Sequence, residues 1–137
     1  MVLDSGDGLR AELLTYGGLL RSLRLHGTHG ETDLVLGLPT LQDYLQDPAY
    51  LGVLVGRFGN RIAGSAFAID GRHYAVTANE GANHLHGGAL GFGRRVWTVL
   101  AQTARHAAVA LRLAGRRGGL PGQRRGGGDP TASTAGA

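Results

Sequence analysis

The stretch "AFAIDGRHYAV", residues 66–76, predicts most about the fold of this chain. Phe67 and Ile69 alternate with small residues before Asp70-Gly71, and the alternation resumes after that pair. Alternation with a period of two places one set of side chains on one face of a strand. An Asp-Gly pair readily adopts the positive φ angles of a two-residue hairpin turn. The stretch therefore predicts two antiparallel strands.

The rest of the first 113 residues predicts further short strands and little helix. We expect extended segments at 11–18 and 19–25, an apolar run at 33–38, a buried strand at 50–56, and two strands between 95 and 113 around a polar break at 102–105. Residues 40–47 predict one short helix with Thr40 as its N-cap. Many short strands without a βαβ repeat predict an all-β sandwich or barrel.

The composition limits the classes of protein that this chain can represent. Its 137 residues suffice for one domain with a core, and 42% of them are hydrophobic. The chain has no cysteine, which excludes disulfides, thiolate nucleophiles and cysteine-bound zinc. The first residues lack the basic start and apolar run of a signal peptide, and no stretch predicts a membrane span. We therefore expect a cytoplasmic protein without membrane contact.

The formal net charge of +4 raises the possibility of nucleic-acid binding, but its distribution argues against it. Four arginines lie after residue 113 beside a single acid, and without this tail the net charge falls to about +1. The tail has no aromatic side chain for base stacking. Because it also has almost no large apolar residue, residues 114–137 are expected to be a disordered Gly/Arg-rich tail after a domain at 1–113.

The segment "GRFGNRIAG", residues 56–64, follows an apolar stretch and carries Arg57, Asn60 and Arg61. A guanidinium beside an amide offers hydrogen-bond donors and an acceptor, which suits a polyol or a carboxylate. The alternative is a surface arginine pair next to a turn. The segment alone leaves both interpretations open.

The segment "NHLHGG", residues 83–88, is a second candidate site. His84 and His86 would share one face of an extended strand. Three interpretations remain open: a metal pair, for which no third ligand of suitable spacing is visible, a structural turn, or imidazole nitrogens that bind ligand hydroxyls. Four other histidines fall in expected turns or exposed strand positions and are expected to be solvated, namely His26, His29, His73 and His106.

Taken together, the two segments resemble the N-terminal part of the aldose 1-epimerase (galactose mutarotase) family. The family pattern is Gly-Arg-x-x-Asn-Arg-Ile, a strand pair across an Asp-Gly turn, Asn-x-Leu-His-Gly-Gly, and then Gly-Phe and a basic residue ahead of Trp. Each element occurs here in that order between residues 56 and 97. The resemblance covers roughly residues 13–113, and the combined motif is far more specific than either half.

The resemblance implies an antiparallel β-sandwich, present here only in part, that binds a hexose in a shallow cleft. It implies that Arg61 and His86 hydrogen-bond the sugar and that Asn60 flanks them. It gives no role to His84, and it implies no cofactor or metal. The preferred hexose, its phosphorylation and the oligomeric state are left open.

The resemblance also implies which groups this chain lacks. Mutarotation needs an acid for the ring oxygen and a base for the anomeric hydroxyl. In the family these are a histidine and a glutamate downstream of this region, as is an aspartate that holds the sugar. We therefore expect a truncated isomerase fragment without activity. The alternative is a non-catalytic carbohydrate-binding or interaction module.

A shifted reading frame offers a hypothesis for the tail. Codons available to residues 113–129, read one base later, can encode Ser-Pro-Asp-Gly-Glu-Glu-Gly-Tyr-Pro-Gly-Asn-Val-Glu-Val-Glu-Val. That translation resembles the loop and the valine-rich strand of the family at this point. The tail would then be a frameshifted continuation of the gene, and its basic charge would have no function.

Overall fold

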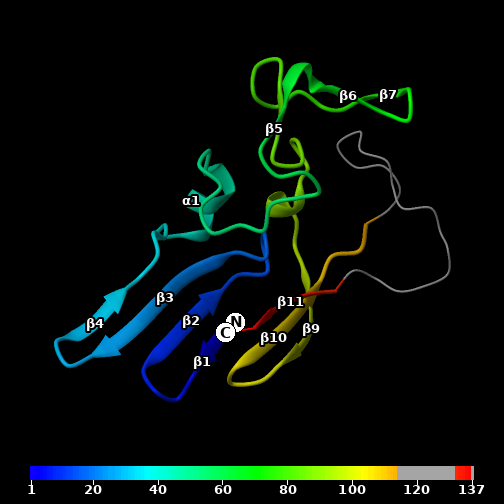
Figure 1. The fold of residues 1–137 in the computed structure, drawn as a ribbon. Helices are drawn as coiled ribbons and strands as arrows, with labels where there is room; N and C mark the ends of the chain where they lie inside the picture. Colours follow the sequence, from blue (N-terminus) through cyan, green and yellow to red (C-terminus); the bar gives the residue numbers. More distant parts are fainter. Residues whose placement is uncertain (114–131, 137) are drawn as a thin grey trace.

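A computed structural model describes residues 1–113 and 132–136, and it contains the predicted Asp-Gly hairpin. Strand β6 (Ala66–Ile69) pairs antiparallel with β7 (Arg72–Ala75), with Phe67 opposite Tyr74. Asp70 and Gly71 have φ angles of 50° and 73°, as the tight turn requires. The rings of Phe67 and Tyr74 stack with centroids 5.3 Å apart. This hairpin projects from the rest of the chain (Figure 1).

Antiparallel strands make up nearly all of the regular structure, which confirms the all-β prediction. One sheet has the order β1-β2-β3-β4, formed by Val2–Asp4, Leu9–Leu13, Leu20–Gly27 and Gly30–Asp33. A second has the order β11-β10-β9, formed by Ala132–Gly136, His106–Ala110 and Thr98–Gln102. The short strands β5 (Arg61–Ile62) and β8 (His84–Leu85) pair at the other end of the molecule (Figure 1). In the described residues no helix is long and apolar enough to cross a membrane.

The two larger sheets contribute to one small hydrophobic core. The strand registers align Leu3 with Ala11 and Ala11 with Leu23, so these side chains share a face of the first sheet. Leu3 and Ala11 are buried together with Ala107 of β10. Met1, Leu13, Leu20 and Leu23 pack around them. Burial of this apolar face stabilises the contact between the two sheets. Hydrogen bonds from the Asp4 N–H to the Ala104 carbonyl at 2.6 Å and from the Gln102 amide to the Val2 carbonyl at 2.9 Å join them as well.

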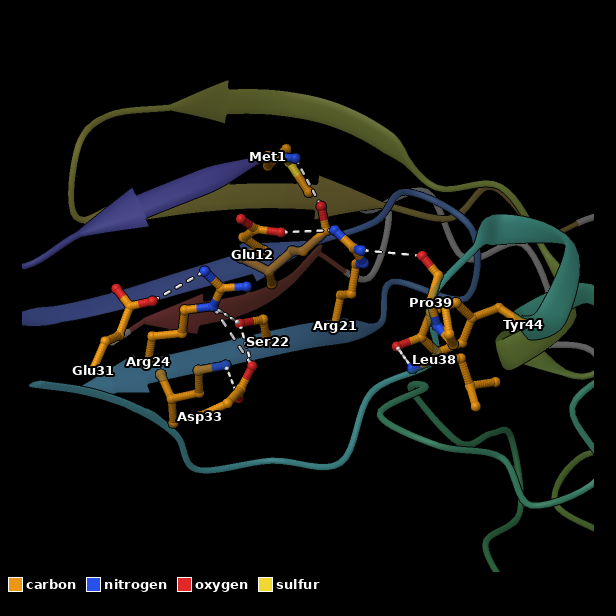
Figure 2. Close-up of polar contacts among 12 residues, drawn as sticks. Met1, Glu12, Arg21, Ser22, Arg24, Glu31, Asp33, Leu38, Pro39 and Tyr44 are labelled. Carbon is orange, nitrogen blue, oxygen red and sulfur yellow. Dashed lines mark hydrogen bonds and ion pairs between the residues drawn. The ribbon is translucent and has the colours of Figure 1, made fainter. Parts of the chain in front are cut away.

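The opposite face of the first sheet carries a network of ion pairs and hydrogen bonds (Figure 2). The Arg24 guanidinium lies 3.1 Å from a carboxylate oxygen of Glu31 and 3.7 Å from one of Asp33. The Ser22 hydroxyl donates to the Asp33 carboxylate at 2.7 Å. These contacts explain how a β-sheet with one apolar face stays solvated on the other.

The predicted short helix is present as α1 (Leu41–Gln46). Thr40 and Asp43 form a capping box in which the Thr40 hydroxyl accepts from the Asp43 backbone N–H at 3.2 Å, and the Asp43 carboxylate accepts from the Thr40 N–H at 3.0 Å. Tyr44 is the buried residue of the helix, and its hydroxyl accepts from the Leu38 N–H at 2.8 Å. The cap therefore fixes the start of the helix, and Tyr44 ties the helix to the loop that precedes it.

Three predicted extended segments are wrong in whole or in part. The segment at 11–18 is a strand only as far as Leu13, where β2 ends. The apolar run at 33–38 is a strand only at Asp33, where β4 ends. The Leu34 N–H makes one more hydrogen bond to the Leu23 carbonyl at 2.7 Å, and the Asp33 carboxylate accepts the backbone N–H groups of Leu23 and Val35.

Residues 50–56 form no strand. They turn at Gly52, whose φ is 65°. Their backbone bonds the loop at 17–20 through Gly52 and Leu54, and the Gly56 carbonyl accepts from the Phe92 N–H.

The predicted disordered tail, 114–137, falls mostly outside the described residues. At Ala132–Gly136, where disorder was predicted, the structure has strand β11, paired antiparallel with β10. Pairing along a strand edge uses only backbone N–H and C=O groups. This pairing therefore does not depend on large apolar side chains.

Leu19 offers a test of the packing, because its side chain is fully buried. Leu19→Ala should lower the free energy of unfolding by about 2–5 kcal/mol, through lost transfer energy and the cavity left behind. Leu36→Ala is the matched control because Leu36 is 80% exposed. Its effect should stay within about 0.5 kcal/mol in the same urea titration. Equal effects of the two substitutions would contradict the observed packing.

Asp33 should make stability depend on acid pH. The Ser22 hydroxyl, with further help from the backbone N–H groups of Leu23 and Val35 and from Arg24, holds the Asp33 pKa below its usual 3.8. A carboxyl with a lowered folded pKa stabilises the fold above its unfolded pKa, and this contribution is lost as pH falls through the folded pKa. Between neutral pH and the acid range, the unfolding free energy should therefore fall more steeply in the wild type than in Asp33→Asn.

Ser22→Ala supplies the control for this pH dependence. It removes the strongest of the interactions that lower the Asp33 pKa while leaving the carboxylate in place. Its pH dependence should lie between those of the wild type and Asp33→Asn. Identical acid slopes in all three proteins would show that Asp33 is not held in this way.

Candidate functional site

The pairing of β5 with β8 brings the two candidate segments together. Arg61 lies opposite Leu85, and Ile62 lies opposite His84. Asn60 directly precedes β5, and His86 directly follows β8. All three predicted site residues, Asn60, Arg61 and His86, therefore lie at the same end of one two-stranded ladder.

Asn60 and His86 bind each other through the backbone and one ring nitrogen. The His86 backbone N–H donates to the Asn60 carbonyl at 3.1 Å, and the Asn60 N–H donates to the His86 Nδ1 at 2.9 Å. Because Nδ1 accepts a hydrogen bond, it carries no proton, and the neutral ring carries its proton on Nε2. Nε2 has no hydrogen-bond partner in the described part of the chain, and His86 is partly exposed. The ring therefore presents an N–H donor.

The His86 ring is also held by aromatic contact. Tyr50 meets it edge to face, with centroids 5.0 Å apart. The Asn79 amide donates to the Tyr50 hydroxyl at 3.3 Å and to the Leu85 carbonyl at 3.0 Å, while its oxygen accepts from the Leu85 N–H at 2.8 Å. The Arg94 guanidinium lies 5.6 Å from the centre of the Tyr50 ring. The orientation of His86 is thus fixed from two sides.

Arg61 is an exposed arginine that forms an ion pair with Glu80. Its Nε and Nη2 atoms each donate to one carboxylate oxygen of Glu80, both at 2.5 Å. The hydrogen bonds from Arg61 lower the Glu80 pKa below its usual range, and those to Glu80 raise the Arg61 pKa. The Arg61 Nη1 is 3.4 Å from the Asn60 Oδ1. Nη1 is therefore the nitrogen of the guanidinium that Glu80 leaves for other contacts.

A close approach of two backbone segments holds the site together. Gly87 has φ of 89°, and a Cβ at this position would collide with the carbonyl oxygen of Gly56. The same Gly56 carbonyl accepts from the Phe92 N–H at 3.1 Å. Only glycine at position 87 satisfies both the backbone angle and the available space. The segment that carries His86 can thereby lie against the one that carries Asn60 and Arg61.

The two histidines of the His-x-His pair have separate surroundings. His84 is fully buried, and its Nδ1 lies 2.8 Å from the Thr77 carbonyl oxygen. His86 has φ of 52° and lies outside β8, so the two residues do not continue one regular strand. In the described part of the chain, no three potential metal ligands come together. His84 is thus an interior residue. Only His86 of the His-x-His pair lies at the candidate site. The four other histidines are exposed, as expected.

Trp97 anchors the end of the histidine-containing stretch. It is 5% exposed, its Nε1 donates to the Phe92 carbonyl at 3.3 Å, and the two rings meet edge to face. Its backbone N–H donates to the Thr15 carbonyl at 2.8 Å, which ties this stretch to the loop before β3. The tryptophan is therefore a packing residue that holds the loop after His86.

Sequence reasoning missed the residues that support the site, namely Tyr50, Asn79 and Glu80. Glu80 is the one acidic residue between the two motifs other than Asp70 of the hairpin turn. In the sequence, this isolated negative charge lies among arginines and histidines. That pattern could have indicated an ion pair at the site. Tyr50 and Asn79 carry no comparable pattern, because their roles depend on contacts across the fold.

The sequence of this chain is similar to those of known proteins. The sequence profile of aldose 1-epimerase matches residues 1–124. Galactose mutarotase of Sus scrofa is 41% identical over 93 residues, which are 67% of this chain and 27% of that protein. Aldose 1-epimerase of Escherichia coli (strain K12) is 32% identical over 123 residues, 89% of this chain and 36% of that protein.

A solved structure agrees with both sequence matches. The crystal structure of the GalM/aldose epimerase homologue from C. elegans superimposes with a TM-score of 0.83 at 36% identity, over 89% of this chain and 38% of that one. The chain thus spans between 27% and 38% of the length of these three relatives.

Substitution of Gly87 tests the close approach at the site. Gly87→Ala combines positive-φ strain with a collision against the Gly56 carbonyl, so it should cost about 2–5 kcal/mol of stability. Gly71→Ala is the matched control, because Gly71 also has a positive φ but open space around it. It should cost only about 1–2 kcal/mol in the same urea titration. If the two variants were equally stable, the backbone segments would not be in contact.

Proposed function

Because the chain belongs to the aldose 1-epimerase family, we propose that Asn60, Arg61 and His86 bind a hexose such as galactose or glucose. The observation that carries this proposal is the reciprocal pair of hydrogen bonds between Asn60 and His86. It sets the tautomer of the neutral ring and presents the Nε2–H as a donor beside the Arg61 guanidinium. Donors in fixed positions are what a site for sugar hydroxyls requires.

The charges and polar groups of the site suit a neutral polyol. Arg61 supplies N–H donors from Nη1, and the Asn60 Oδ1 supplies an acceptor 3.4 Å away. His86 supplies one further donor. A sugar hydroxyl both donates and accepts, so it can bridge such a set. Tyr50, already in contact with His86, adds an aromatic ring next to these polar groups.

We further infer that these residues bind the sugar without interconverting its anomers. Mutarotation requires a base that takes the proton of the anomeric hydroxyl and an acid that protonates the ring oxygen. Glu80 is the carboxylate paired with Arg61, and that pairing lowers its pKa. A carboxyl with a lowered pKa is a poor proton acceptor near neutral pH. Binding alone, without a positioned acid and base, does not raise the rate.

The test is a titration of the full 137-residue chain with galactose, followed by NMR. Resonances of Asn60, Arg61 and His86 should shift with an affinity that is at best millimolar. His86→Gln should bind about threefold to tenfold more weakly, because it loses one oriented hydrogen bond. His73→Gln is the matched control on an exposed strand position and should bind like the wild type.

Polarimetry on the same protein separates binding from catalysis. The wild-type chain should show no mutarotation of galactose above the uncatalysed background. Catalysis that His86→Gln abolishes would contradict the inference that Asn60, Arg61 and His86 only bind. Shifts that are absent, or equal in His86→Gln and the wild type, would contradict the hexose site itself.

A further inference from the structure

The ion pair between Arg61 and Glu80 contributes more to the orientation of the Arg61 guanidinium than to the stability of the fold. The two side chains are 54% and 36% exposed, and an ion pair this open to water contributes little to the folding free energy. Its form is nevertheless specific, because one carboxylate binds Nε and Nη2 together. A bidentate contact fixes the plane and the direction of a guanidinium as well as its position. The contact therefore matters for where the Arg61 donors point.

The backbone of Glu80 is held in a turn that directly precedes β8, the strand paired with the one that carries Arg61. Glu80 and Asn83 close a tight turn, with N–H to carbonyl distances of 3.1 Å and 2.9 Å in the two directions. The Asn83 side chain accepts from the Gly64 N–H at 3.2 Å, and the Ser65 hydroxyl donates to the Ala82 carbonyl at 2.8 Å. The turn is thus tied to the residues that follow β5. Glu80 has a fixed backbone from which to hold Arg61.

The remaining donors of Arg61 lie on the side of Asn60. Nη1 approaches the Asn60 Oδ1, and the backbone N–H of Asn60 binds His86. On the premise that this site binds a hexose, we propose that Glu80 is a positioning residue. By occupying Nε and Nη2, it directs Nη1 toward the sugar beside the Nε2–H of His86. Glu80 itself makes no contact with the sugar in this arrangement.

The first experiment measures the pairing without any sugar. In the ¹⁵N-labelled 137-residue chain, the Arg61 Nε–H, assigned by its disappearance in Arg61→Lys, should exchange slowly with water. In Glu80→Gln, which keeps the shape but not the charge, this exchange should speed up about tenfold. Glu80→Asp, which keeps the charge, should lie between the two. Equal exchange in the wild type and Glu80→Gln would overturn the proposal.

The second experiment measures the consequence for binding. Glu80→Gln should bind galactose about threefold to tenfold more weakly than the wild type, with an unchanged Tm and circular dichroism spectrum. In an Arg61→Ala background, Glu80→Gln should have no further effect on affinity, because its influence passes through Arg61. Glu31→Gln, which breaks the exposed ion pair with Arg24 away from the site, is the matched control and should leave affinity unchanged.

The outcomes separate the two proposals. If the wild type binds galactose and Glu80→Gln binds it equally well, or if the two substitutions have additive effects, the positioning role is wrong and the hexose site stands. If the wild-type chain binds no galactose while the Arg61 Nε–H is protected, the hexose site is wrong and the role of Glu80 in binding falls with it.

Discussion

Gly87 lies against the carbonyl oxygen of Gly56 with no space for a side chain between them, and the whole candidate site depends on this approach. It lets a loop that begins at His86 lie against a segment that ends at Asn60. A backbone contact of this kind is set by sterics, so it has one arrangement rather than a range of them. The polar contacts of the site are built on that single arrangement.

The orientation of the polar groups comes from backbone hydrogen bonds rather than from burial. His86 is aligned by the N–H of Asn60, and Glu80 is aligned by its turn with Asn83. Such bonds are insensitive to salt, unlike attraction between exposed charges. The ion pair between Arg61 and Glu80 then acts at the end of two rigid segments. A weak, exposed interaction can fix a direction because its partners have little freedom left.

The features that could be predicted from the sequence are those determined by residues close together along the chain. The Asp70-Gly71 hairpin and the Thr40 helix cap depend on local backbone chemistry, and both are confirmed. The grouping of Asn60, Arg61 and His86 was implied by two motifs whose combination is specific to a family. Their meeting in the structure follows from the pairing of β5 with β8.

The features that were missed depend on residues distant in the chain. Residues 50–56 are apolar enough for a strand, but Gly52 turns them toward the loop at 17–20. His84 looks equivalent to His86 in sequence, yet its ring lies in the interior against the Thr77 carbonyl. Glu80 gains its partner only when the turn at 80–83 folds back beside β5. Periodicity and propensity carry no information about such contacts.

The distribution of buried side chains indicates how the site can respond to a ligand. The hydrophobic cluster around Leu3, Ala11 and Ala107 lies between the larger sheets, away from the β5–β8 ladder. At the ladder, Asn60 and Arg61 are exposed, and the structure is held by hydrogen bonds, close glycine contacts and Trp97. Regions with few buried apolar contacts open locally at lower free energy than the core. A ligand that joins Arg61 to His86 would therefore stabilise this end of the molecule selectively, because it adds contacts where the protein itself has few.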